Sequence, residues 1–194
     1  MLNKEMLIFD LDGTVIDSHH RVVKALATGE FCLETYLAEC NTPELIAKDT
    51  LLPLATFMQD LASKGTPFAV ITARYLTAVD TQFLRDHKLV SYNTILLGRE
   101  SVTKEIRALS DAMYKVHQIK LLQSHFRSYS YFTLFDDKAD ICEAINALPF
   151  CSAIDAVSLN KVLANQSELI QHQDTIKAYQ SFASEPVIAD LFAC

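Results

Sequence analysis

The chain has 194 residues, of which half are hydrophobic and 21% are charged, and its formal net charge is −7 at pH 7. This length allows one domain with a substantial core, with or without a small appendage, and excludes two full domains. The acidic excess argues against a protein that coats nucleic acid, and no apolar stretch approaches the roughly 20 residues of a membrane helix, so we expect a cytoplasmic protein that does not bind membranes.

Short apolar segments typical of buried strands alternate with segments of helical spacing along most of the chain. The predicted strands are residues 6–10, 68–72, 94–97, 131–135 and, more weakly, 151–154. The predicted helices between them are residues 51–64, 76–87, 109–126 and 137–148. Because such an alternation needs crossover connections, it predicts an α/β fold, a three-layer Rossmann-like parallel sheet with helices on both faces.

Two helix-prone segments lie outside this alternation. Residues 19–48 separate the first strand from the next unit, and we expect them to form a small helical cap insert, with a site that has no cap as the open alternative. Residues 165–182 have amphipathic helical spacing, and we expect them to pack on the body of the protein. The composition marks no linker, so we expect a single domain over residues 1–194.

Polar side chains follow the last apolar residue of three predicted strands. Asp10 and Asp12 follow the first strand, Thr72 ends the second, and Asp136 and Asp137 close the fourth. Ligands of open parallel sheets bind at the carboxyl ends of the strands, beside the point where the strand order reverses. We therefore expect these five side chains to gather in one site.

The segment Phe9-Asp10-Leu11-Asp12-Gly13-Thr14 carries the strongest signal. Two carboxylates so close together repel each other unless a cation or a proton lies between them, and Gly13 permits the turn that both need. A hard divalent ion fits, because Mg²⁺ typically takes one or two protein carboxylates together with phosphate oxygens and waters. A strand followed by a plain acidic turn is the weaker interpretation.

Residues 7–14 resemble the first motif of the haloacid dehalogenase (HAD) superfamily of phosphohydrolases without a departure. The resemblance extends to the second motif, Val70-Ile71-Thr72, and to the acidic fourth motif, Phe135-Asp136-Asp137, so it covers most of residues 6–157. It implies a HAD-like fold and a phosphatase. A phosphotransferase stays open, because it differs only in the acceptor that reaches the intermediate.

The resemblance also implies groups that bind the phosphate. The third motif requires a lysine, for which Lys115 is the first choice and Lys120 the rival. The Thr72 hydroxyl and the Lys115 ammonium would hold the equatorial phosphoryl oxygens, and Ala73 continues the second motif. We therefore expect Thr72, Ala73 and Lys115 to bind phosphate.

The superfamily mechanism assigns a role to each acidic residue. Asp10 would attack phosphorus and form an aspartyl-phosphate. Asp12 would protonate the leaving oxygen and then take a proton from the attacking water. The implied cofactor is Mg²⁺, held by the Asp10 carboxylate, the Asp12 main-chain carbonyl and Asp136, with Asp137 binding directly or through water. Asp12 favours a phosphate ester over a halogenated compound as the substrate, since a halide leaves unprotonated and needs no proton donor.

Thr72-Ala73-Arg74 and the helix that follows resemble the phosphatase portion of phage-type polynucleotide kinases, which carry Ser/Thr-Gly-Arg at this point. Ala73 departs from that pattern, and the sequence contains no kinase P-loop. From Arg74 to Arg127 there are nine Lys and Arg against five Asp and Glu, although these charges equally suit ordinary helix faces. Arg74 is therefore a candidate substrate-binding residue.

These features favour a nucleotide or polynucleotide 3'-phosphate as substrate, with a 5'-nucleotidase or a sugar-phosphate phosphatase close behind. The expected partner is thus a phosphorylated small molecule, a nucleotide or a nucleic-acid end, and the oligomeric state stays open. A HAD-fold binding module without turnover is the alternative from another class. Such a module should have lost its nucleophile or its metal-binding acids, and this sequence retains Asp10, Asp12 and Asp136.

Overall fold

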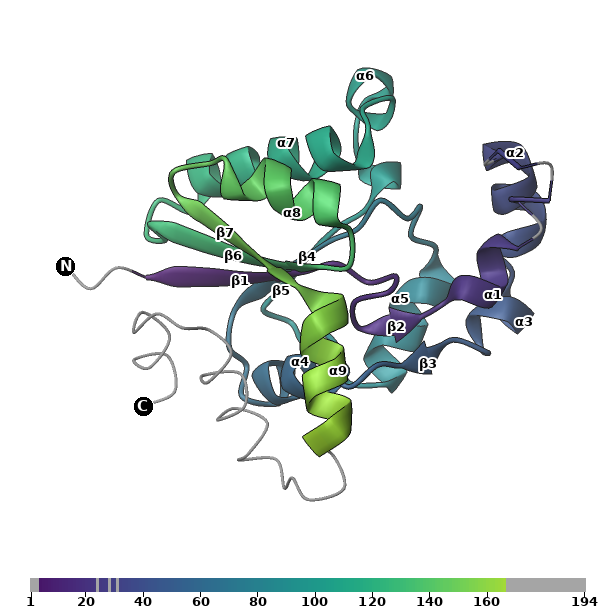
Figure 1. Ribbon diagram of the computed structural model, residues 1–194, viewed down its shortest axis with the longest axis horizontal. Helices are drawn as coiled ribbons and strands as arrows, with labels where there is room; N and C mark the ends of the chain where they lie inside the picture. Colours follow the sequence, from purple (N-terminus) through teal and green to yellow (C-terminus); the bar gives the residue numbers. More distant parts are fainter. Residues whose placement is uncertain (1–3, 24, 28, 31, 167–194) are drawn as a thin grey trace.

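A five-stranded parallel sheet forms the centre of the protein in this computed structural model, which describes residues 4–166 except for residues 24, 28 and 31 (Figure 1). The strand order is β5-β4-β1-β6-β7. The strands are β1 (Glu5–Phe9), β4 (Phe68–Ile71), β5 (Thr94–Leu97), β6 (Tyr131–Asp136) and β7 (Cys151–Asp155). The chain leaves β1 toward one edge and returns on its other side at β6, so the strand order reverses at β1, where a ligand crevice is expected.

Helices cover both faces of the sheet (Figure 1). On one face lie α4 (Ala55–Ser63), α5 (Ala78–Asp86) and α9 (Ala156–Gln166), and on the other lie α7 (Asp111–His125) and α8 (Ala139–Asn146). Alternate residues of β1 point to opposite faces, so Leu7 and Phe9 belong to the first core cluster and Met6 and Ile8 to the second. This arrangement confirms the predicted α/β fold.

Residues 19–46 form a separate group of short helices beyond the carboxyl end of β1 (Figure 1). The group contains α1 (His19–Val22), α2 (Leu33–Thr35), the π-helical turn η1 (Tyr36–Cys40) and α3 (Pro43–Ile46). It is flanked by an antiparallel pair, β2 (Ile16–Asp17) and β3 (Thr50–Leu51), and Ala25, Tyr36 and Cys40 form a small core of its own. We call residues 19–46 the insert.

Two parts of the fold differ from the sequence-based expectation. The 310 turn η2 (Arg99–Ser101) and α6 (Lys104–Arg107) occupy the connection between β5 and α7, where no element is predicted. Helix α9 begins at Ala156, where the Asp155 carboxylate accepts hydrogen bonds from the Val157 amide at 3.0 Å and the Ser158 hydroxyl at 2.5 Å. Most of the helix expected over residues 165–182 lies outside the described residues. No helix in the described part of the chain is long and apolar enough to cross a membrane.

Candidate active site

The carboxyl ends of β1 and β6 bring three acidic side chains together. The Asp10 amide donates to the Phe135 carbonyl at 3.0 Å and so continues the β1–β6 pairing one residue past the strand. Carboxylate oxygens of Asp10, Asp136 and Asp137 all lie within 4.8 Å of one another. Asp10 and Asp136 are buried, so this cluster lies at the bottom of the site rather than on its rim.

A tight turn follows Asp10 and sets the position of Asp12. The Leu11 carbonyl accepts from the amides of Thr14, Val15 and Ile16 at 3.2, 3.0 and 2.9 Å, and Gly13 has a φ of 73°. A Cβ atom at Gly13 would lie 2.5 Å from Asp137 Oδ2 and 2.8 Å from Asp137 Cγ. Glycine therefore meets two requirements, a left-handed backbone and close approach to a carboxylate.

Lys115 lies between two of the acidic residues. Its Nζ atom is 2.8 Å from Asp10 Oδ1 and 2.5 Å from Asp136 Oδ2, and its side chain is buried. Burial lowers the pKa of Lys115, but the carboxylates of Asp10 and Asp136 outweigh burial and hold that pKa above its usual value. Lys120, the rival candidate on the same helix, is exposed.

Burial dominates the electrostatics of the acidic cluster. It raises the pKa of Asp10 to about 7, against the opposing effect of Lys115 and with a further contribution from the charge of Asp136. Burial also raises the pKa of Asp137, and the charge of Asp136 acts in the same direction. One ammonium therefore does not neutralise the three carboxylates, and a second cation would stabilise their ionised forms.

The acidic cluster fits a magnesium ion on chemical grounds. Its donors are all carboxylate oxygens, which hard divalent cations prefer. Asp137 Oδ1 is buried and has no hydrogen-bond partner, so one ligand atom is available without breaking a contact. Asp10, Asp136 and Asp137 are thus residues that could hold the metal.

The second motif lies directly after β4. The Thr72 amide donates to the Leu97 carbonyl at 3.0 Å, and the Thr72 hydroxyl oxygen accepts from the Arg74 amide at 3.2 Å. Thr72 is buried, and both it and Ala73 line the same pocket as Asp10. The loop therefore places Thr72 and Ala73 in the wall of the pocket that also contains Asp10.

Arg74 contacts Asp12. Arg74 Nε donates to Asp12 Oδ2 at 3.1 Å, Arg74 Nη2 contacts Asp12 Oδ1, and the Ser18 hydroxyl donates to the same oxygen. Burial acts to raise the pKa of Asp12, but Arg74 and Ser18 outweigh it and hold that pKa at about 2. Arg74 is only 4% exposed, so the predicted substrate-binding residue is already engaged with protein groups.

A buried charge network, which sequence analysis missed, extends from Arg74 to the insert. Arg74 Nη1 donates to Asp80 Oδ1 at 2.8 Å, and Arg21 Nη1 donates to the same oxygen at 3.1 Å and to Asp49 Oδ2 at 3.2 Å. Asp80 also completes a capping box with Thr77 at the start of α5. That Thr-x-x-Asp spacing was a visible signal for Asp80, whereas nothing in the sequence indicates that Arg21 is buried.

We expect Asp80→Ala to lower the free energy of unfolding by about 3–5 kcal/mol, because it removes one of the two carboxylates that balance two buried guanidinium groups and leaves them only Asp49 in common. Urea unfolding at pH 7 measures this change. Asp86→Ala, on the exposed side of the same helix, is the matched control and should shift stability by less than about 0.5 kcal/mol. Equal effects of the two substitutions would show that the network contributes nothing specific.

The acidic cluster, the second motif and the insert surround one pocket of about 740 Å³. Its volume is within the range of about 300–1,000 Å³ that is typical of small-ligand sites. Asp136 is not among the lining residues, but it contacts Lys115, which lines the pocket. The other sequence-predicted site residues line the pocket: Asp10, Asp12, Thr72, Ala73, Arg74, Lys115 and Asp137.

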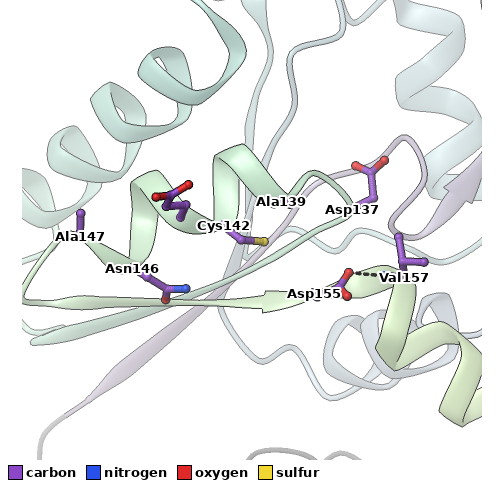
Figure 2. Close-up of a pocket in the computed structure, with 8 residues that line it drawn as sticks. Asp137, Ala139, Cys142, Asn146, Ala147, Asp155 and Val157 are labelled. Atoms are coloured by element: carbon purple, nitrogen blue, oxygen red, sulfur yellow. Dashed lines mark hydrogen bonds between the residues drawn. The ribbon is translucent and has the colours of Figure 1, made fainter.

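A second hollow lies beside α8 and the start of α9 (Figure 2). Its polar groups are largely engaged within the protein. Asp155 accepts from the Val157 amide at 3.0 Å, as Figure 2 shows, and Asn146 Oδ1 accepts from the Ala153 amide at 2.7 Å. Asp137 lines this hollow and also belongs to the acidic cluster. The pocket that contains Asp10 is therefore the better candidate for the site of chemistry.

Known proteins resemble this chain in sequence and in structure. Residues 1–186 match the family model described as bacteriophage T5 5'-deoxynucleotidase. The 5'-deoxynucleotidase of Escherichia phage T5 is 31% identical over 172 residues, which cover 82% of this chain and 70% of that protein. A solved structure, a haloacid dehalogenase-like hydrolase from Streptococcus pneumoniae, aligns with a TM-score of 0.49 and 16% identity, covering 84% of this chain and 98% of the other.

Proposed function

Because the chain belongs to the bacteriophage T5 5'-deoxynucleotidase family, we propose that it removes the phosphate from deoxynucleoside 5'-monophosphates. The protein is a phosphohydrolase, and its parallel sheet with helices on both faces is the fold that the resemblance to the HAD superfamily implies. The observation that carries the proposal is the contact of Lys115 with both Asp10 and Asp136 at the base of a pocket. This contact supports the proposal that Asp10 as nucleophile, Lys115 as phosphate-binding cation and Asp136 as metal-binding acid act in one site.

Asp10 is the proposed nucleophile. Its carboxylate attacks phosphorus, the bond to the 5'-oxygen breaks, and an aspartyl-phosphate forms on Asp10. The Lys115 ammonium is 2.8 Å from the attacking carboxylate, where it favours the ionised form and can also contact the transferring phosphoryl group. The Thr72 hydroxyl and the Ala73 backbone, which belong to the second motif and line the same pocket, provide further polar contacts to the phosphoryl group.

Asp12 is the proposed proton donor and acceptor. In the substrate-free protein Arg74 holds Asp12 as a carboxylate. A phosphate dianion entering the pocket competes for the Arg74 guanidinium and repels the charge on Asp12, and both effects raise the pKa of Asp12 toward protonation. Asp12 then protonates the departing 5'-oxygen and later takes a proton from the water that hydrolyses the intermediate. Arg74 is thereby a proposed phosphate-binding residue as well.

The proposed cofactor is Mg²⁺, held by the carboxylates of Asp10 and Asp136 and the Asp12 main-chain carbonyl, with Asp137 bound directly or through water. When bound, the ion offsets the repulsion between an anionic nucleophile and an anionic phosphate. The unpartnered Asp137 Oδ1 and the raised pKa of Asp137 support an oxygen-ligated cation at this point.

We further propose that residues 19–48 act as a small cap within a single domain. Val22 and Leu33 from the insert line the pocket, and the buried Arg21 connects the insert to α5 through Asp80. A wall of this kind suits a mononucleotide better than a polymer, because it closes one side of the phosphate site.

The sequence-based preference for 3'-phosphates and polynucleotide ends has less support. The matched proteins are named for a 5'-deoxynucleotidase, and the resemblance to polynucleotide kinases stays a prediction. Two arginines of the basic stretch are buried rather than presented to a polymer: Arg74 contacts Asp12 and Asp80, and Arg99 pairs with Asp111 at 2.7 Å. We therefore propose the 5'-mononucleotide, rather than a 3'-phosphate or a polynucleotide end, as the preferred substrate.

A substrate panel tests this order. We expect kcat/KM for deoxynucleoside 5'-monophosphates to exceed that for the 3'-monophosphates and for a 3'-phosphorylated oligonucleotide by at least about tenfold, which corresponds to about 1.4 kcal/mol. Activity should require Mg²⁺ and disappear after chelation. A 3'-phosphorylated oligonucleotide hydrolysed as well as the 5'-monophosphates, or full activity in the chelator, would contradict the proposal.

A further inference from the structure

Tyr75 occupies a fixed position between the second motif and the insert. Asn41 Nδ2 of the insert donates to the Tyr75 carbonyl at 3.2 Å. On the other side, the Leu76 amide donates to Glu100 Oε2 at 2.8 Å. The phenol ring lines the pocket that contains Asp10, and the side chain is only partly buried. Two hydrogen bonds therefore hold the backbone on either side of Tyr75, and its partly exposed side chain lies in the pocket that contains the proposed phosphate site.

Arg107 covers this ring. Its guanidinium carbon lies 5.6 Å from the centroid of the Tyr75 ring, and Arg107 lines the pocket too. Arg107 Nε donates to the Arg99 carbonyl at 3.1 Å and Arg107 Nη2 to the Val102 carbonyl at 3.1 Å. These carbonyls hold the guanidinium against one face of the Tyr75 ring, so a ligand that stacks on the ring would use the opposite face.

Apolar side chains of the insert line the same pocket. Leu26 and Leu33 are 42% and 40% exposed, and Val22 accompanies them. A phosphate gains nothing from apolar groups, so they suit a different part of the ligand. Pocket walls with an aromatic ring and branched aliphatic side chains suit a flat, largely apolar group such as a nucleobase.

We propose that Tyr75, held by Arg107, is the stacking platform for the nucleobase of the substrate, with Leu26 and Leu33 contributing apolar contacts from the insert. This inference rests on the proposed function and names the part of the pocket that recognises a nucleotide rather than any phosphate ester. Stacking uses the π-face that every base has, so the platform predicts similar recognition of all four deoxynucleotides.

The test compares nucleotides with deoxyribose 5-phosphate, which carries the same phosphate and sugar without a base. For Tyr75→Ala we expect the ratio of kcat/KM for each deoxynucleotide to that for deoxyribose 5-phosphate to fall about tenfold, mainly through KM. Tyr75→Phe keeps the ring and should stay within about twofold of the wild-type ratio. Tyr92→Ala, at a ring that is 92% exposed and does not line the pocket, is the control and should leave the ratio unchanged.

Tyr75→Leu is the second variant, because it keeps apolar volume without a ring, and it should lower the ratio as well. An unchanged ratio in Tyr75→Ala or Tyr75→Leu would overturn the proposal, as would a drop confined to one base. Calorimetric binding of deoxyadenosine 5'-monophosphate to Asp10→Asn, with and without Tyr75→Ala, separates this inference from the proposed function. Weaker binding in the double variant supports the platform even if the wild type hydrolyses no nucleotide, and equal binding overturns it.

Discussion

Asp10→Asn lowers kcat for deoxynucleoside 5'-monophosphates by at least about 10⁴-fold, because an amide neither attacks phosphorus nor carries the negative charge that the site is built around. Asp10 is buried beside Lys115, and neighbouring Asp12 and Asp136 are held in other contacts. Neither of these two carboxylates therefore takes over its place, and the loss should appear in kcat more than in KM.

Phosphate release at saturating Mg²⁺ measures this effect, and the melting temperature of the variant checks its fold. Asp140→Asn, at an exposed acidic residue on α8, is the matched control and should retain wild-type activity. An Asp10→Asn protein that keeps more than about a tenth of the wild-type kcat would contradict a nucleophilic role, since loss of a nucleophile costs far more than that.

Lys115→Met has the second large expected effect, and it acts on both activity and stability. Activity should fall by about 10²–10³-fold, because the variant loses a preorganised cation beside the transferring phosphoryl group. The variant also leaves the buried carboxylates of Asp10 and Asp136 without their shared cation. We therefore expect the free energy of unfolding without metal to fall by about 3–5 kcal/mol at pH 8.

The stability loss in Lys115→Met should depend on pH. In the wild type the pKa of Asp10 is already raised to about 7, mainly by burial, and removing the ammonium raises the pKa of Asp10 further. An acid whose pKa is raised by folding stabilises the folded state at low pH, and this contribution is lost as the pH rises through the folded pKa. The variant should therefore be closer to wild type at pH 5 than at pH 8.

Lys120→Met is the control on the same helix, because Lys120 is exposed while Lys115 is buried. Urea unfolding with and without Mg²⁺ measures both variants, and the ion should recover part of the stability lost in Lys115→Met. If Lys120→Met loses as much activity as Lys115→Met, the assignment of the third-motif lysine is wrong.

The strand ends were predictable because buried parallel strands are continuous apolar runs. Each run ends visibly at a polar residue, so Asp10, Thr72 and Asp136 could be placed at one edge of the sheet without coordinates. Their proximity follows from the strand order, in which β1 lies between β4 and β6. Lys115 was harder to identify, because its neighbours along α7 say little about which side of the helix is buried.

Other features of the site depend on contacts between distant segments. Arg21, Asp49 and Asp80 belong to three separate parts of the chain, and only the folded structure joins them. A count of basic residues likewise cannot separate the buried Arg74 and Arg99 from the exposed Lys104. The charge excess between Arg74 and Arg127 therefore suggested a surface for nucleic acid that the positions of these two arginines do not support.

The account depends most on the covalent step at Asp10. Rapid acid quenching during turnover of a deoxynucleotide, followed by borohydride reduction, converts a phosphorylated aspartate into homoserine, which tandem mass spectrometry locates in the tryptic peptide of residues 5–21. We expect homoserine at position 10, only when substrate and Mg²⁺ are both present. Homoserine at position 12 or 17, or none anywhere during active turnover, would contradict nucleophilic attack by Asp10.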